Sequence, residues 1–508
     1  MSDQKATTRN PWAWIPTLYF TQGIPYVMVM SVSVMMYKNL GVSNTDIAFF
    51  TSLLYFPWFL KFAWGPFIDM FKTKRFWTIS MQFLVGVALF GIALSVNTSI
   101  YWQLTLIVFA LMAFASATHD IAADGFYMLS LDQSKQAAFV GVRSTFYRIA
   151  TIVGSGVLVV IAGQLAPTMG FKGAWSVVFM ITGAMFIILF FYHKFILPYP
   201  KEDQGTLKGK KLSGSQIFLL AGGFALFALV VYLAFLLFGF LLSLFGVGSP
   251  WNTILTTILL VVVLVILFRT FVATFVEKFE KSESKNDTLL PFIEFLKAFV
   301  IFMQKKDIWN ILGFLLFFRF AEAQLVKLVQ PFLLDPRTEG GLGLTTSEVG
   351  IVYGTVGIIA LTAGGLIGGY VISKKGLKWW LWPMVIIMHT PDLAFVYLSH
   401  YQPTNFVLIN LAVAAEQFGY GFGFTAYMMF MIMVSQGEHK TAHYAICTGI
   451  MALGMMLPGM FSGALQETIG YPRFFEWVLI STIPGFIVAG LVKIDPEFGK
   501  KKEEPVKV

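Results

Sequence analysis

Long apolar segments alternate with short polar ones along most of the chain. A helix needs about 20 predominantly apolar residues to cross the hydrocarbon core of a membrane. By that measure the sequence predicts fourteen spans, so both termini should lie on one side. Their expected limits are 12–36, 46–66, 76–96, 99–121, 138–163, 173–195, 216–245, 251–277, 308–334, 346–371, 379–400, 404–433, 441–467 and 472–492.

Composition and charge agree with a membrane protein. Of 508 residues, 57% are hydrophobic and 12% charged, whereas a soluble domain carries about 25% charged residues. Loops on the side of the termini hold 25 Lys and Arg residues, and the other side holds only Lys38, Lys172, Arg337 and Arg473. This asymmetry places the termini in the cytoplasm. The net charge of +9 is spread over short runs between spans, so no nucleic-acid partner is expected.

Two stretches indicate an internal repeat. Residues 65–75 read GPFIDMFKTKR after the second span, and residues 368–378 read GGYVISKKGLK after the second span of the last six. Each combines glycine, apolar residues and a basic cluster, although Ile372 stands where Asp69 would align. Asp69 and its basic neighbours are predicted to form a cytoplasmic latch, one part of a gate. The alternative is a basic turn with an incidental acid.

The spans divide into six, two and six. The extra pair carries almost no polar side chains, so it is expected to face lipid and is assigned no chemistry. Residues 289–304, with Glu294 and Lys297, suit an amphipathic helix on the cytoplasmic surface. The expected parts are an N-terminal six-helix half at 1–195, a linker with the extra spans at 196–290, a C-terminal six-helix half at 291–495 and a tail at 496–508.

Polar side chains inside the first span of the C-terminal half are candidates for a substrate pathway. This span contains Arg319, Glu322, Gln324, Lys327 and Gln330, and polar and charged residues at such depth usually line a pathway or pair with one another. Arg319 and Glu322 lie three residues apart and can neutralise each other along a helix. A buried ion pair that only fixes packing is the alternative, but it leaves Lys327 unexplained. Lys327 falls near the same sector of the helix as Arg319.

A lone acid, Glu416, lies mid-span in the second half, beside Gln417 and Tyr420. An ionised carboxylate is costly at that depth, so the side chain is expected to hold a proton. A group that gains and loses a proton is what a proton-coupled carrier needs, and Glu322 is the next candidate. The alternative is a neutral acid bonded to a backbone carbonyl.

The N-terminal half carries its own acids in ATHDIAADGFYMLSL (117–131), where Asp120 and Asp124 lie one helical turn apart. Arg143 and Arg148 open the next span and are expected to pair with them, which favours a gate near the cytoplasmic mouth over ligand contact. Gln22 and Lys61, inside the first two spans, are candidates for substrate binding. The complete set of residues predicted to bind substrate is Gln22, Lys61, Arg319, Gln324, Lys327, Gln417 and Tyr420.

Three segments, LYFTQGIPY, LKFAWGPFIDMF and SATHDIAADGFYMLSL, resemble the AmpG-type permeases, a branch of the major facilitator superfamily related to acetyl-coenzyme A transporters. The matching residues are Gly23, Pro25, Lys61, Phe62, Trp64, Pro66, Asp69, Asp120, Ile121 and Asp124. The resemblance implies an all-α polytopic membrane protein with the major facilitator fold, its two six-helix halves separated here by two extra helices. It further implies proton-driven import of cell-wall anhydro-muropeptides across a bacterial inner membrane. By charge complementarity alone, Lys61, Arg319 and Lys327 are expected to face the carboxylates of such a substrate.

Functions other than proton-driven muropeptide import are also compatible with parts of the sequence. A carrier of another bulky solute, such as an oligosaccharide, a nucleotide-linked cofactor or a siderophore, is the alternative within transport. A membrane enzyme acting on a lipid-linked substrate would need a loop to hold the acceptor, and the short loops offer none, so no enzyme is expected. A receptor or scaffold would not need the intramembrane charges. The expected partners are a small-molecule substrate, protons and lipid, with no cofactor, no metal and a monomeric state.

Overall fold

The computed structural model describes residues 9–203, 233–280, 290–437 and 439–500. Every regular element in these residues is a helix. The chain divides into two compact units. The first comprises Met1–Gly65, Lys74–Asp203 and Asp307–Val508, and the second comprises Pro66–Thr73 and Gln204–Lys306.

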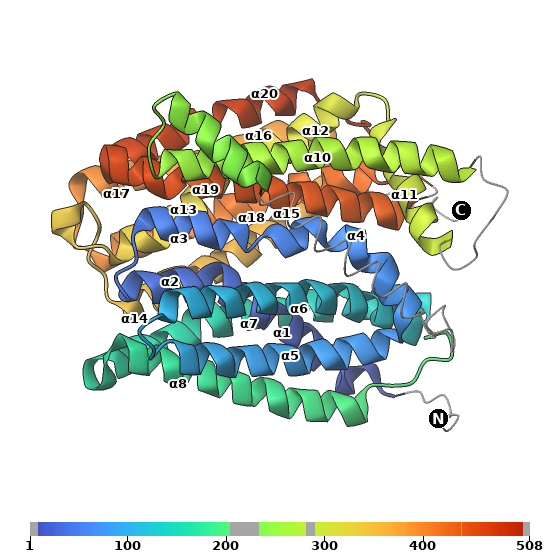
Figure 1. The fold of residues 1–508 in the computed structure, drawn as a ribbon, viewed down its shortest axis with the longest axis horizontal. Helices are drawn as coiled ribbons and strands as arrows, with labels where there is room; N and C mark the ends of the chain where they lie inside the picture. Colours follow the sequence, from blue (N-terminus) through green and yellow to red (C-terminus); the bar gives the residue numbers. More distant parts are fainter. Residues whose placement is uncertain (1–8, 204–232, 281–289, 438, 501–508) are drawn as a thin grey trace, which may run out of the picture. The chain divides into compact units, whose positions relative to one another are not determined.

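The first unit contains two groups of helices, an N-group and a C-group (Figure 1). The N-group consists of η1 (Pro11–Ala13), α1 (Ile15–Val27), η2 (Met28–Val32), α2 (Ser33–Asn39), α3 (Asn44–Leu53), α4 (Phe56–Phe71), α5 (Lys74–Ser95), α6 (Tyr101–Ser130), α7 (Gln133–Ile152), η3 (Val153–Leu158) and α8 (Val159–Ile196). The last residues of α4 belong to the second unit.

The C-group follows the same plan of long helices joined by short turns. It consists of α12 (Ile308–Phe317), α13 (Phe320–Leu334), η4 (Arg337–Glu339), α14 (Thr346–Ile351), η5 (Val352–Gly357), α15 (Ile358–Lys375), α16 (Leu377–His389), α17 (Asp392–Tyr401), α18 (Phe406–Val434), α19 (Lys440–Ile480) and α20 (Ile483–Leu491). We call the end of the helices at which α1 begins the terminal end, drawn on the right in Figure 1, and the other end the opposite end.

Two kinks confirm that the groups are related. The helix α8 breaks at Gly170 (φ 72°) and α19 breaks at Gly470 (φ 76°). A positive φ of this size is readily adopted only by glycine. Each kink lies between the fifth and sixth spans expected for its half, so each group turns back at the same place in its sequence.

Among the described residues, seven helical stretches are long and apolar enough to cross a membrane. Two of them, Gly141–Ile196 with 56 residues and Lys440–Leu491 with 52, are each longer than one crossing requires because they include these kinks. The chain is therefore a multi-pass membrane protein. In the first unit the helix limits agree with the expected spans to within several residues.

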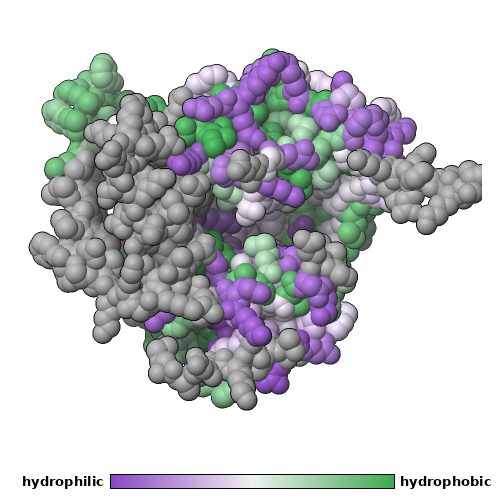
Figure 2. All heavy atoms as spheres, turned by 90° about the vertical axis from the view of Figure 1, so that its right-hand side faces the viewer, coloured by the Kyte–Doolittle hydropathy of each residue, from purple (hydrophilic) through white to green (hydrophobic). Residues whose placement is uncertain are grey.

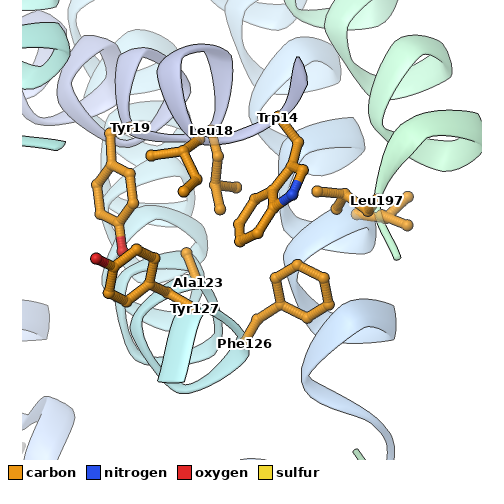
Figure 3. Packing of buried hydrophobic residues seen from close by; sticks show 9 residues of the cluster. Trp14, Leu18, Tyr19, Ala123, Phe126, Tyr127 and Leu197 are labelled. Carbon is orange, nitrogen blue, oxygen red and sulfur yellow. The ribbon is translucent and has the colours of Figure 1, made fainter. Parts of the chain in front are cut away.

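Aromatic packing at the terminal end ties α1 to α6. Figure 3 shows the cluster, which contains Trp14, Ile15, Leu18, Tyr19, Ile79, Ala123, Phe126, Tyr127 and Leu197. The rings of Trp14 and Phe126 meet edge to face with centroids 5.4 Å apart, and those of Tyr19 and Tyr127 with centroids 5.9 Å apart. Such pairs stabilise beyond their buried area. This cluster supports the part of α6 that carries Asp120 and Asp124.

Glycines let the backbones of the N-group and the C-group approach each other closely. A Cβ on Gly354 of η5 would lie 1.9 Å from the backbone oxygen of Ser155 in η3. A Cβ on Gly463 of α19 would lie 2.0 Å from the backbone oxygen of Asn44, at the start of α3. Any larger side chain would therefore force the two backbones apart.

The second unit contains the helix Leu233–Leu244, α10 (Trp251–Glu280) and α11 (Leu290–Met303). The amide of Asn252 donates to the backbone oxygens of Gly239 (2.9 Å) and Val247 (3.1 Å), which closes a helical hairpin. Along the sequence, the helix Leu233–Leu244 and α10 overlap the two expected extra spans, and α11 overlaps the expected surface helix. Residues 216–232 of the first extra span lie outside the described residues, as does the side chain of Glu294.

The glycine contact yields a prediction. Gly463→Ala should weaken the packing of α3 on α19 by about 1 to 3 kcal/mol, because an added methyl overfills a close contact. We expect a cysteine placed at the buried Ser52, in a Cys447→Ala background, to become more reactive toward a water-soluble maleimide. Gly369→Ala is the control, since a Cβ there meets nothing within 4 Å. Equal labelling in the two variants would contradict the prediction.

Candidate functional site

A cavity of about 470 Å³ lies between the N-group and the C-group. Three π-helical turns contribute to its wall, through Met30 and Ser31 of η2, Ser155 of η3 and Tyr353 of η5. Turns of this kind often occur at functional sites. Figure 2 shows the terminal end, where hydrophilic residues surround a recess.

The charge of the cavity wall is positive. Among the described residues that line it, Lys61, Arg148 and Arg319 are cations and Asp120 is the one carboxylate. Asp120 accepts a hydrogen bond from the indole of Trp58 (3.1 Å) and interacts electrostatically with Lys61. In the described part of the chain no ion pair engages Arg148 or Arg319. Two cations are thus left to attract an anion. Aromatic residues complete the wall, including Tyr26, Tyr55, Tyr147, Tyr353 and Tyr420.

Of the ion pairs expected between the two acids and the two arginines, the structure contains one. Arg143 donates to Asp124 at 2.6 Å, and Tyr19 donates to the same oxygen at 3.1 Å. The guanidinium of Arg143 also stacks 4.2 Å from the ring centroid of Tyr19 and 4.3 Å from that of Tyr127. These residues all belong to the N-group, so this pair joins helices within one group. A gate that opens as the groups separate needs contacts between groups instead.

Arg319 lies at a helix break. The helix α12 ends at Phe317, α13 begins at Phe320, and Arg319 has φ −107° and ψ 21°. Its guanidinium donates to the hydroxyl of Tyr420 and lies 4.7 Å from the ring centroid of Phe424. No ion pair joins Arg319 to Glu322 in the described residues, in contrast to the expected helical pair, because the break turns Arg319 out of line with α13.

Because of the same break, Lys327 does not lie on the side of the helix that it was expected to share with Arg319. Lys327 is 3% exposed and donates to the hydroxyl of Thr51 in α3 (3.0 Å). It lies 5.2 Å from the ring centroid of Tyr55. Gln324 likewise faces the protein, where it bonds to Ser481 (3.2 Å) and Trp477 (2.7 Å). Neither side chain lines the cavity in this conformation.

The other predicted binding residues lie at or behind the wall. Gln417 and Tyr420 line the cavity, and Gln22 is buried next to Asp120. Gln330, which belongs to the predicted polar run of this span but not to the predicted binding residues, also lines the cavity and donates to Ser31 across the two groups at 2.6 Å. The side chain of Asp69 lies outside the described part of the chain.

Glu416 and Glu322 lie behind this wall, each 1% exposed. One oxygen of Glu416 accepts a hydrogen bond from Gln417 (2.9 Å), and the two acids interact electrostatically. The structure adds His389 and Asp392, which lie 3.4 Å apart and belong to the same buried region. The sequence HTPD (389–392) inside an apolar span was the signal that could have identified them.

The opposite end is closed by polar contacts between the groups, which the sequence did not reveal. Lys38 of α2 pairs with Asp335, just after α13, at 2.5 Å. Tyr471 donates to Asp335 at 2.6 Å, and Asn44 donates to Gln466 at 2.7 Å. We call these five residues the opposite-end latch. Together with the glycine contacts, it closes the cavity at that end.

The basic cluster after α4 makes contacts within its own group. The backbone amides of Lys74 and Arg75 donate to Asp203 (2.6 and 2.9 Å), and the guanidinium of Arg75 lies 3.9 Å from the ring centroid of Tyr199. In the C-group the amide of Leu377 donates to Phe498 at 3.0 Å. In each group the segment after the last helix therefore covers the start of the third span, which extends the internal repeat.

Comparisons with known proteins agree with this architecture. The family model described as Major Facilitator Superfamily matches residues 17–318. The chain is 22% identical over 485 residues to a Rickettsia conorii protein that bears the name transporter AmpG 4, with 93% of this chain and 94% of that protein covered. A Haemophilus influenzae protein described as uncharacterized is 21% identical, with 92% of this chain and 91% of that protein covered.

Solved transporter structures share the fold. A POT family transporter in complex with a thioalcohol-conjugated peptide superposes with a TM-score of 0.63 at 13% identity, covering 94% of this chain and 95% of the other. The nucleoside transporter NupG gives a TM-score of 0.56 at 15% identity, covering 94% and 96%. The family model covers more than half of the chain, and the two groups of helices enclose a central cavity. The chain therefore belongs to the major facilitator superfamily of secondary transporters.

Proposed function

We propose that this protein imports a bulky anionic sugar-peptide, of the anhydro-muropeptide class, across a bacterial inner membrane in symport with protons. The positive cavity wall is the observation that carries the proposal. Arginine and lysine bind carboxylates through charge-assisted hydrogen bonds, and the aromatic residues of the wall offer flat apolar faces to sugar rings. The full-length similarity to proteins named as AmpG transporters supports the same substrate class.

The proposed topology has fourteen spans with cytoplasmic termini. The two groups of the first unit supply six each, and the helices of the second unit supply two. The orientation rests on the excess of Lys and Arg in loops at the terminal end. In this orientation the opposite end is periplasmic, so the structure represents a state open toward the cytoplasm.

The substrate contacts that we propose follow from the wall. No ion pair engages Arg319 or Arg148 among the described residues. Arg319 interacts electrostatically with Glu322, and Lys61 interacts in the same way with Asp120. Gln417 and Tyr420 add hydrogen-bonding groups on the C-group side. The opposite-end latch is the gate that must open to admit substrate. The pair between Asp124 and Arg143 keeps α6 and α7 moving together at the terminal end.

Glu416 and Glu322 are the groups that we propose to carry the coupling proton. Both are buried behind the wall, and an unpaired ionised carboxylate in such a place is costly. Binding or release of a proton therefore changes the free energy of the conformation in which these acids are buried. Coupling requires that a proton favour one conformation over another in this way.

The topology predicts the location of reporters. Alkaline phosphatase and green fluorescent protein fusions at residues 205 and 248 should place these positions in the cytoplasm and the periplasm, respectively. The reason is that one expected span separates them. Activity of both fusions on one side would contradict fourteen spans.

The substrate site predicts a selective loss of affinity. Arg319→Gln should raise the KM for labelled anhydro-muropeptide about 10- to 100-fold, because a hydrogen bond to a charged group contributes about 1.5 to 3 kcal/mol. Uptake into proteoliposomes measures the effect, and the exposed Arg473→Gln is the control. The wild-type protein could instead show saturable uptake of an oligosaccharide, a nucleotide-linked cofactor or a siderophore. If anhydro-muropeptide did not compete with that uptake, the proposed substrate would be rejected.

Loss of the proposed proton site should affect gradient-driven accumulation and substrate exchange differently. Glu416→Gln should abolish accumulation driven by a pH gradient and leave exchange of internal for external substrate close to the wild-type rate, because exchange moves no net proton. The exposed Glu476→Gln should accumulate normally. Gradient-driven accumulation by Glu416→Gln with an unchanged pH dependence would place the proton elsewhere.

A further inference from the structure

A histidine and an aspartate interrupt the third span of the C-group. The helix α16 ends at His389 and α17 begins at Asp392. Their side chains are 4% and 1% exposed, and Nδ1 of His389 lies 3.4 Å from Oδ2 of Asp392. Beyond this mutual contact, neither ring nitrogen of His389 and neither oxygen of Asp392 has a hydrogen-bond partner in the described part of the chain. Buried polar atoms are normally satisfied, so two side chains that have no partner except each other need an explanation.

Other titratable groups face this pair from two neighbouring helices. Glu322 of α13 interacts electrostatically with Asp392, and Glu416 of α18 interacts with both acids. Arg319 interacts with Glu322 but directs its guanidinium to Tyr420.

The remaining side of the pair is apolar. The ring of Phe486 in α20 has its centroid 5.8 Å from that of His389, and a Cβ on Gly485 would lie 3.7 Å from Nε2 of the same histidine. The buried group thus contains three carboxyls and one imidazole, while the guanidinium of Arg319 belongs to the cavity wall.

We propose that His389 and Asp392 belong to the proton-coupling site, forming with Glu322 and Glu416 one buried chain of proton-exchanging groups that ends at the cavity wall. The inference rests on the proposed function and extends it from two acids to four groups on three spans.

Geometry joins His389 to Asp392, and Glu416 accepts its hydrogen bond from Gln417 of the cavity wall. Electrostatic interactions link Asp392 to both Glu322 and Glu416, and Glu322 to Glu416. A proton taken up by Glu416 neutralises that carboxylate. Its transfer to Glu322 or Asp392 leaves Glu416 ionised and the acceptor neutral, so each step moves one proton and conserves charge.

The side chains of His389 and Asp392 fit such a chain better than a static structural role. Ionising all three buried carboxylates together is costly because they interact electrostatically, so we expect them to share protons. Oxygens without fixed partners are available to accept a proton. A metal centre is a poorer explanation, because no group of three or more His, Cys, Asp or Glu among the described residues has the geometry to hold an ion.

The test compares accumulation with exchange in proteoliposomes that contain the full chain and use labelled anhydro-muropeptide as the probe. We expect Asp392→Asn to reduce pH-driven accumulation at least tenfold, to keep exchange within twofold of wild type and to flatten the pH dependence of uptake. We expect His389→Gln to shift the pH midpoint of uptake. Asp392→Glu retains a carboxyl and should recover accumulation, which a purely structural role would not predict.

A surface pair of the same chemistry provides the control. His400 and Glu476 lie 3.3 Å apart at exposed positions, so His400→Gln should leave both transport modes unchanged. Normal accumulation by Asp392→Asn, with loss of accumulation by Glu416→Gln, would overturn the inference and leave the proposed function intact. Normal accumulation by both variants would overturn both. Loss of exchange together with accumulation in Asp392→Asn, without recovery in Asp392→Glu, would assign the pair a structural role and also overturn the inference.

Discussion

The close approach of the two helical groups at the opposite end is the contact on which the rest of the structure depends. Gly354 and Gly463 permit backbone contact there, and the latch adds an ion pair between Lys38 and Asp335. Packed interfaces of this kind have discrete arrangements and do not deform continuously. While this contact holds, the cavity is closed at one end, and its charged wall can exchange solute only through the other.

Burial of charge constrains the interior in two ways. The cations Arg148 and Arg319 line the cavity, and we propose that they bind the anionic substrate. The acids behind the wall are each 1% exposed, so we propose that their ionisation is tied to a proton rather than to a counter-ion. Gln417, which lines the cavity and donates to Glu416, joins the two proposed sites.

Sequence patterns predicted the elements well and the side-chain partners poorly. Hydropathy placed the helices of the first unit to within several residues, and the motif around Asp69 indicated the repeat. The partners of Arg319 and Lys327 were missed because the rule of 100° per residue holds only within a continuous helix, and the chain breaks at Arg319. The latch was missed because Lys38 and Asp335 are almost 300 residues apart, and nothing local to either one reveals the other.

The latch closes one end of the cavity, and we propose that substrate opens this end and closes the other. Distances between spin labels measure this directly, with one pair at Ser99 and Thr404 on the opposite end and a second pair at Asp132 and Lys374 on the terminal end. With anhydro-muropeptide added at acidic pH, we predict that the first distance increases while the second decreases. Distances that stay constant, or that change in the same direction at both ends, would contradict the account.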